Sequence, residues 1–245
     1  MAELAWDREA VRRLRTGDID ALREGRPLTP VLQHIGQALL DAGSTTDEGL
    51  VRRCVPGLQE RDATGDDVLV LELQALVGES PRSDYVPWPL APVPVLLPDL
   101  GDFLDGDPLQ GDGAIDLQTG FIYPPGILDI DRPDELDEDS ESYDPDRWLF
   151  FQPESRPGYR DMVDFAADLP DGRLRELLFL ALDGRGAFRR FRGVFNDEAY
   201  DAELTHWTLF RNEREIGRAR AWLAEAGYRS HQQTDRSPTT LRLLD

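Results

Sequence analysis

Lysine is absent from this sequence of 245 residues, and all 27 basic side chains are arginine. The absence excludes the phosphate-binding loop of P-loop nucleotidases, whose motif requires a lysine. We attribute the arginine bias to genomic base composition, because arginine codons are GC-rich, and not to a need for bidentate donors throughout the chain.

Cysteine is nearly absent, with Cys54 as the single thiol. One cysteine excludes an intramolecular disulfide, and it excludes a zinc site built on several thiolates. Disulfide-free chains are typical of reducing compartments, so the composition predicts a cytoplasmic setting.

Long apolar runs are also missing. The most apolar stretch, 86–100, contains five prolines and is too short to cross a bilayer as a helix. The first 15 residues carry four arginines and three acids without the apolar core of a secretory signal. The sequence therefore predicts a protein that neither enters a membrane nor is exported.

Acidic side chains are in large excess, with 48 acids against 27 arginines and a formal charge of −21. This charge argues against general nucleic-acid binding, which needs a basic surface. The excess lies before Arg147, because residues 147–245 carry 16 acids and 16 arginines. Its densest part is Asp131–Asp146, with nine acids and one arginine, which predicts a solvated and poorly ordered loop.

The charge map and the prolines predict two structured parts and an α+β fold class. We expect a mainly helical segment at 1–80 and a proline-rich connector at 81–96. An α+β domain with a short antiparallel sheet and several helices follows at 97–228, interrupted by the acidic loop at 131–146. Residues 229–245 are expected to form a C-terminal tail.

Within the first part, apolar spacing predicts a helix from Thr29–Pro30 to the stop at Gly43. A second helix is expected from Thr46, ending at Pro56. The run VLVLEL at 68–73 follows a turn signal and predicts a β-strand. Two shorter helices are expected at 6–14 and 19–22.

Within the second part, the pattern predicts a short helix at 97–104 and a β-hairpin turning at 118–120. A buried strand is expected at 148–153. Further helices are expected at 159–169, at 174–182 with Asp171 as its cap, and from Asn212 to Gly227. Between them, Gly184 and Gly186 predict a chain reversal into a helix that directs Phe188, Phe191 and Phe195 toward the core.

Signatures of catalysis and cofactor binding are missing. The sequence contains no dinucleotide-binding fingerprint, no zinc-protease motif and no nucleophile elbow. The acidic run lacks the spacing of a calcium loop. We interpret His34, His206 and His231 as structural or surface residues. The sequence therefore predicts no catalytic residue, no cofactor and no metal site, and it favours a protein that is not an enzyme.

Four arginines form the sharpest candidate site: Arg185, Arg189, Arg190 and Arg192 lie within eight residues that contain no acid. They occupy the turn and second helix of a helix–glycine turn–helix unit, an order that resembles a DNA-reading helix-turn-helix. Four interpretations are open. The arginines pair with the acids of the same domain, such as Asp161, Asp164 and Asp168, or they bind an acidic protein partner, a nucleic acid or a substrate.

Several segments resemble the bacterial uncharacterised protein family 0158. The most specific is the octet Gly-Arg-Gly-Ala-Phe-Arg-Arg-Phe at 184–191. Residues 159–165, Trp207 with Phe210, and 221–227 are also similar to that family, as is the hairpin at 116–120. The resemblance covers about 97–228 and implies a small cytoplasmic α+β domain, with no catalytic residue to carry over.

The sequence thus predicts a noncatalytic binding or regulatory module that interacts through its Arg-rich helix. The alternatives are a nucleic-acid-binding protein that uses the same helix, and an enzyme whose pocket would bring together His206 and Arg185. A further hypothesis is that the acidic loop folds back over the arginines and shields them. The oligomeric state stays open.

Overall fold

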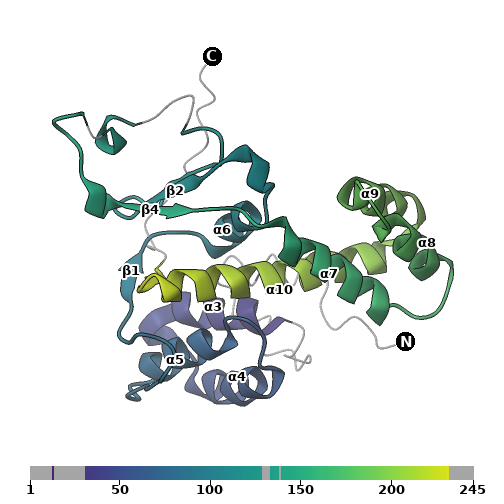
Figure 1. Ribbon diagram of the computed structural model, residues 1–245. Coiled ribbons are helices and arrows are strands. Elements are labelled where there is room, and N and C mark those ends of the chain that lie inside the picture. The colour runs from purple at the N-terminus through teal and green to yellow at the C-terminus, as the bar shows by residue number, and fades with distance from the viewer. Residues whose placement is uncertain (1–12, 14–30, 129–132, 138, 232–245) are drawn as a thin grey trace.

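The computed structural model describes Arg13 and residues 31–128, 133–137 and 139–231 (Figure 1). These residues form eight α-helices, a two-stranded parallel sheet and a three-stranded antiparallel sheet. The predicted α+β class is therefore confirmed. The short helices expected at 6–14 and 19–22 fall almost entirely outside the described residues.

Helix α10 (Asp201–Glu225) runs through the middle of the molecule, and the other elements surround it (Figure 1). Its first part carries Trp207 and Phe210 into one apolar cluster, and its last part carries Ile216 and Leu223 into another. One helix thus links separate cores, because each stretch of it presents apolar side chains to a different neighbour.

Three helices form a bundle on one side of α10: α3 (Leu32–Ala42), α4 (Glu48–Arg61) and α5 (Asp66–Leu76). Helix α3 ends at Gly43 as predicted. Helix α4 begins at Asp47, whose carboxylate accepts a hydrogen bond from the backbone N–H of Gly49 at 2.9 Å. The bundle buries Ile35, Leu39, Cys54, Leu58, Leu69 and Leu73, among others.

Two predictions for this bundle are wrong. Pro56 does not end α4, which continues to Arg61. Pro56 lies on the exposed side of the helix, and the buried Leu58 stabilises the turn that follows it. Residues 68–73 are helical and not a strand. Helix α5 is covered on more than one side, since Val68 and Leu71 belong to a different cluster from Leu69 and Leu73. A helix that is buried all round lacks the one-sided periodicity that distinguishes it from a buried strand.

The segment expected to be a connector contributes to the packed body. Strand β1 (Ala91–Val93) pairs in parallel with β5 (Tyr228–Ser230), directly after α10. Val93 and Val95 are buried in the same cluster as Leu223. The parallel pair thus joins residues 91–93 to residues 228–230. Residues 229 and 230, which were expected to begin the C-terminal tail, belong to strand β5.

The second sheet follows α6 (Leu97–Leu104), whose bounds match the predicted helix. Its strands β2 (Gly113–Asp116), β3 (Ile122–Tyr123) and β4 (Trp148–Phe151) lie in the order β3–β2–β4 with antiparallel neighbours. The predicted hairpin is confirmed, and Gly120 has a φ of +71° at its turn.

Asp116 ties the hairpin to the acidic segment, which we define as residues 133–137 and 139–146. Burial raises the pKa of Asp116, but hydrogen bonds from Arg147 and Thr119 outweigh it and hold the pKa at about 2. Arg147 also pairs with Glu135 at 3.4 Å, and Leu136 is buried against Ala114 and Trp148. The expectation of a wholly solvated loop is therefore wrong at Leu136.

Helices α7 (Ser155–Asp168), α8 (Arg173–Leu182) and α9 (Ala187–Glu198) pack around the first part of α10 at one end of the molecule (Figure 1). Phe165 is fully buried at their centre. Asp171 does not cap α8 as predicted. The N-cap is Gly172, and the Asp171 carboxylate accepts a hydrogen bond from Arg175 Nη1 at 2.5 Å.

Asn212 lies inside α10 and does not start a helix as predicted. The helix begins at Asp201, where the backbone N–H of Tyr200 donates to Glu203 Oε2 at 3.1 Å. Because the residues on both sides of Asn212 pack against other elements, helical geometry continues through it. The predicted end at Gly227, with a φ of +88°, is confirmed.

Glu215 on α10 supplies a pH-dependent prediction. Burial, aided by the nearby Asp102 and Asp105, raises its pKa to about 7 despite the adjacent Arg211. A raised carboxyl pKa means that stability is lost as the pH rises from the ordinary value toward 7. Glu215→Gln is therefore expected to match the wild type near pH 4 and to be more stable by about 1–3 kcal/mol at pH 8.

Urea unfolding at both pH values measures this effect. Glu225→Gln, an exposed change on the same helix, is the control and is expected to change the free energy of unfolding by less than about 0.5 kcal/mol. A Glu215→Gln variant whose stability differs from that of the wild type by the same amount at both pH values would contradict the burial argument.

Candidate interaction surface on helix α9

The four arginines predicted as a site lie on the turn between α8 and α9 and on α9 itself. Gly184 and Gly186 have φ values of +77° and +76°, which let the chain reverse within four residues. The predicted reversal is therefore confirmed. It places α9 beside α8 at the end of the molecule farthest from the acidic segment (Figure 1).

Arg190 closes this turn. Its Nε donates to the carbonyl oxygen of Ala181 at 3.1 Å, and its terminal nitrogens donate to the carbonyl oxygens of Asp183 and Arg185. These carbonyls lie at the end of α8 and in the turn, where backbone acceptors lack helical partners. The guanidinium of Arg190 is thus occupied within the fold.

The other three arginines face solvent. Arg185, Arg189 and Arg192 are exposed, and the side chain of none of them forms a hydrogen bond or ion pair with any residue in the described ranges. Arg189 and Arg192 lie on the same outward side of α9 as Gly193 and Asn196, which are also exposed. This side of the helix therefore presents two exposed guanidinium groups to solvent.

The predicted pairing of these arginines with Asp161, Asp164 and Asp168 is wrong in the described structure, where none of the three acids contacts them. Asp161 pairs with Arg214 at 2.9 Å and with Arg218 at 2.8 Å, and Asp164 pairs with Arg214 at 2.6 Å. These contacts join α7 to α10. The acids of α7 therefore leave the arginines of α9 unpaired.

Phe188 extends the cationic surface with apolar area. It was expected in the core, but 44% of it is exposed, and Ala187, Phe191 and Phe195 fill the core instead. Its ring lies beside Gly158 of α7. We define the α9 surface as Arg185, Phe188, Arg189 and Arg192.

Helix α8 exposes two further large apolar residues, Phe179 at 40% and Leu180 at 71%. Arg175 lies over the Phe179 ring, 5.8 Å from its centroid. Neither residue was predicted from the sequence to be exposed. The available signal was that neither belongs to the buried pattern of Leu174, Leu178 and Leu182.

The enzyme alternative requires His206 and Arg185 to meet in a pocket. His206 is half-buried against Phe165, with ring centroids 5.1 Å apart. Burial lowers its pKa, and the charges of Asp168 and Glu203 oppose that shift only in part. Arg185 lies on the exposed α8–α9 turn. The packing of His206 on an aromatic ring accounts for its place in the fold.

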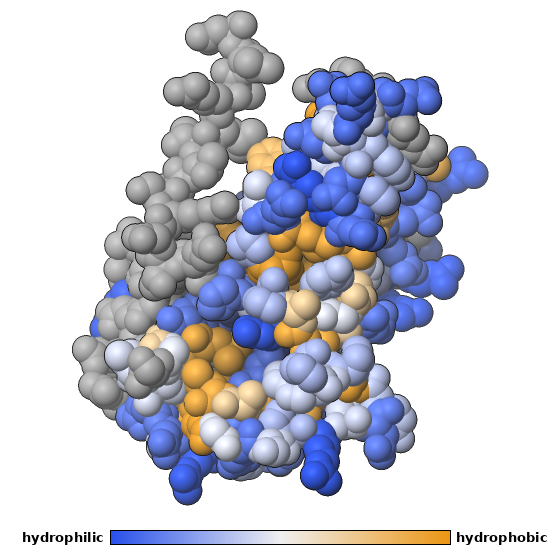
Figure 2. Space-filling model, turned by 90° about the vertical axis from the view of Figure 1, so that its left-hand side faces the viewer, coloured by the Kyte–Doolittle hydropathy of each residue, from blue (hydrophilic) through white to orange (hydrophobic). Residues whose placement is uncertain are grey.

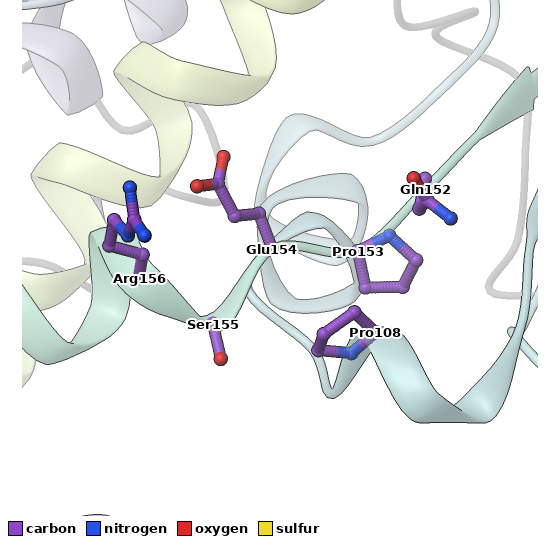
Figure 3. A pocket seen from close by; sticks show the side chains of 6 residues that line it. All are labelled: Pro108, Gln152, Pro153, Glu154, Ser155 and Arg156. Atoms are coloured by element: carbon purple, nitrogen blue, oxygen red, sulfur yellow. The ribbon is translucent and has the colours of Figure 1, made fainter.

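A surface pocket of about 470 Å³ lies where β4 leads into α7. Figure 3 shows that the rings of Pro108 and Pro153 face each other, while Ser155 points away from the side chains of Glu154 and Arg156. Its polar groups therefore do not converge on one point, as a substrate site would require. The six lining residues are Pro108, Gln152, Pro153, Glu154, Ser155 and Arg156.

Within residues 31–128, 133–137 and 139–231, no group of three or more histidine, cysteine, aspartate or glutamate side chains is arranged to hold a metal ion. In the same residues, no helix combines the length and the apolar character that a membrane crossing needs. The α9 surface is therefore the feature of the described chain with the clearest chemical character.

Gly193 on α9 supplies a stability prediction. No atom lies within 4 Å of the position that a Cβ would occupy, so Gly193→Ala is expected to raise the free energy of unfolding by about 0.5–1 kcal/mol. Thermal unfolding measures the change. Gly217→Ala on α10 is the contrasting control, because its Cβ would lie 2.3 Å from the carbonyl oxygen of Thr64 and destabilise the fold. A loss of stability in Gly193→Ala would show that the site is not open.

Comparisons with known proteins add no relative to this description. No protein-family model matches the chain, and neither the curated proteins nor the solved structures give a match.

Proposed function

We propose that this chain is a noncatalytic binding module whose α9 surface recognises a carboxylate-rich surface of a protein. The supporting observation is that Arg185, Arg189 and Arg192 stay exposed and unpaired in the described structure, although the chain has a large excess of acids. Guanidinium groups bind carboxylates through paired hydrogen bonds. The surface is therefore suited to a partner that supplies the acids.

The apolar neighbours of these arginines favour a protein over a nucleic acid. Phe188 is exposed within the surface, and Phe179 and Leu180 are exposed on the preceding helix. Protein interfaces are enriched in arginine and aromatic residues. A nucleic acid would instead meet three available arginines on the α9 surface of a chain of net charge −21.

Nucleic-acid binding is the alternative, because α9 is the second helix of a helix–turn–helix order. Its recognition helix would use Arg189 and Arg192, since the guanidinium of Arg190 is engaged by the turn. The salt dependence of binding separates the two functions, because each phosphate contact adds nearly one unit to the slope of log K against log salt.

We also propose that the protein is cytoplasmic and that its second part is related to family 0158. A single cysteine, which cannot form an intramolecular disulfide, supports the reducing compartment. Cys54 is fully buried, and burial raises the pKa of its thiol to about 12, which makes it a weak nucleophile. Several residues that carry the resemblance to family 0158 contact one another in the cluster around Phe165, namely Phe191, Trp207 and Phe210. The resemblance therefore concerns residues that hold the α9 surface in place.

The test compares two double variants that change the charge by the same amount. Arg189→Glu/Arg192→Glu reverses the α9 surface, and Arg52→Glu/Arg53→Glu reverses two exposed arginines on α4. Binding to a fluorescent poly-glutamate peptide and to a fluorescent DNA duplex is measured by anisotropy over a range of salt concentrations. The first variant is expected to bind poly-glutamate at least about tenfold more weakly, because repulsion replaces attraction.

The α4 variant is expected to bind poly-glutamate like the wild type. Equal losses in both variants would show that net charge, and not the α9 surface, governs binding. Tighter binding to the duplex than to poly-glutamate, with a salt slope of several units, would replace the proposed function with nucleic-acid binding.

A further inference from the structure

We infer that the acidic partner is a second copy of this chain, whose acidic segment binds the α9 surface of the first. The inference rests on the proposed function and names the partner of the same surface. Both complementary surfaces occur on one chain: residues 97–146 carry 16 acids and one arginine, and the α9 surface carries three unpaired arginines.

The acidic segment presents carboxylates that no arginine of the described structure neutralises. Only Glu135 of this segment forms an ion pair with a described residue, through Arg147. Five acids of the segment are exposed and form no ion pair within the described structure: Asp134, Asp137, Asp139, Glu141 and Asp146.

The α9 surface of a chain is out of reach of its own acidic segment. The two lie at opposite ends of the molecule in Figure 1, with the antiparallel sheet and α6 between them. Burial of Leu136 against Trp148 and the ion pair between Arg147 and Glu135 hold the segment on the sheet. The hypothesis that the loop shields its own arginines is therefore wrong for this arrangement, and the contact must be made between molecules.

Exposed aromatic residues beside the acidic segment provide apolar area to bury. Phe121 is 50% exposed, and its ring lies 4.7 Å from that of Tyr123, which in turn contacts Trp148 beneath Leu136. Phe150 on β4 is 49% exposed. Figure 2 shows this side of the molecule, with hydrophilic surface at the top and an apolar patch directly below it. The α9 surface offers Phe188 in return.

The net charge of −21 opposes association at long range. At about 0.15 M salt, charges are screened over roughly 8 Å, so the repulsion between whole molecules falls while contacts between adjacent groups persist. The contact joins two different surfaces, so a dimer keeps one free α9 surface on one copy and one free acidic segment on the other. Such head-to-tail contacts extend into chains unless they close into rings.

Sedimentation velocity of the full chain at about 0.15 M salt and rising protein concentration tests the inference. The weight-average sedimentation coefficient of the wild type and of Arg52→Glu/Arg53→Glu is expected to rise with concentration. Two variants are expected to stay monomeric: Arg189→Glu/Arg192→Glu, and Asp134→Asn/Asp137→Asn/Asp139→Asn in the acidic segment.

Mixing the two monomeric variants is the decisive step. Each retains the surface that the other lacks, so an equal mixture is expected to form a dimer and nothing larger. Two variants that stay monomeric when mixed would overturn the inference, and so would a wild type that is monomeric at every concentration. Poly-glutamate binding keeps the outcomes apart: a monomeric wild type that still binds the peptide removes the second copy as partner but leaves the proposed function intact.

Discussion

Replacing Glu213 with alanine is expected to lower the free energy of unfolding by about 3–5 kcal/mol. The Glu213 carboxylate on α10 accepts hydrogen bonds from the backbone N–H groups of Gln33 and His34, each at 2.9 Å, at the start of α3. It also contacts the His34 ring and pairs with Arg61 at 3.0 Å. Its removal leaves two buried N–H groups without their acceptor and takes one of two carboxylate partners from the largely buried Arg61 guanidinium, which keeps Asp66.

The size of this effect follows from burial and charge together. Burial raises the pKa of Glu213, but the hydrogen bond and charge of His34 and the charge of Arg61 outweigh it, so the pKa lies below its ordinary value. A lowered carboxyl pKa stabilises the fold above the unfolded-state pKa, and this stabilisation is lost as the pH falls through the folded-state value. The full loss is therefore expected at neutral pH.

Urea unfolding at pH 7 measures the change. Glu225→Ala removes an exposed carboxylate from the same helix and is expected to change stability by less than about 0.5 kcal/mol. Glu213→Gln retains the shape of the side chain but loses its charge, and is expected to lie between the wild type and Glu213→Ala. A loss below about 1 kcal/mol in Glu213→Ala would mean that this network does not join α3 to α10.

Replacing Phe165 with alanine is expected to cost about 3–5 kcal/mol of unfolding free energy. The side chain is fully buried between α7, α9 and α10. Its ring lies 5.7 Å from Phe195, 5.1 Å from Trp207 and 5.5 Å from Phe210, centroid to centroid. Alanine would leave a cavity among rigid rings, which have little freedom to close it.

Phe179→Ala is the matched control, because this ring is 40% exposed and fills no cavity. Its expected effect is at most about 1 kcal/mol, measured by urea unfolding alongside Phe165→Ala. Phe165→Ala is also expected to weaken poly-glutamate binding, because the cluster positions α9. Similar stabilities for both variants would show that Phe165 is not central to this core.

Several elements could be predicted from local patterns. The helix at 97–104, the hairpin around Gly120 and the reversal at Gly184 and Gly186 depend on short-range periodicity and on backbone angles that glycine adopts easily. The errors lay where contacts from distant segments outweighed local preference. Residues 68–73 are helical because two apolar clusters bury them from different sides. Helix α10 continues through Asn212 because the residues before and after Asn212 in the chain pack against other elements.

The candidate site shows the same division. The four arginines and the turn that presents them were evident in the sequence, but their roles were not. Arg190 differs from Arg189 only in that it meets the carbonyl groups at the end of α8. Phe188 differs from Phe191 in that its side of α9 has no core to enter. Neither distinction exists before α8 and α9 are placed side by side.

Composition and short-range pattern were sufficient for the acidic character, the α+β class, the absence of standard catalytic motifs and the position of the arginine cluster. Long-range contacts decided which of those arginines stay free, because Arg214 and Arg218 of α10 pair with acids of α7 while the turn after α8 engages Arg190. A carboxylate pairs with a guanidinium that folding brings within about 4 Å of it. That distance depends on three-dimensional packing and not on the order of residues along the chain.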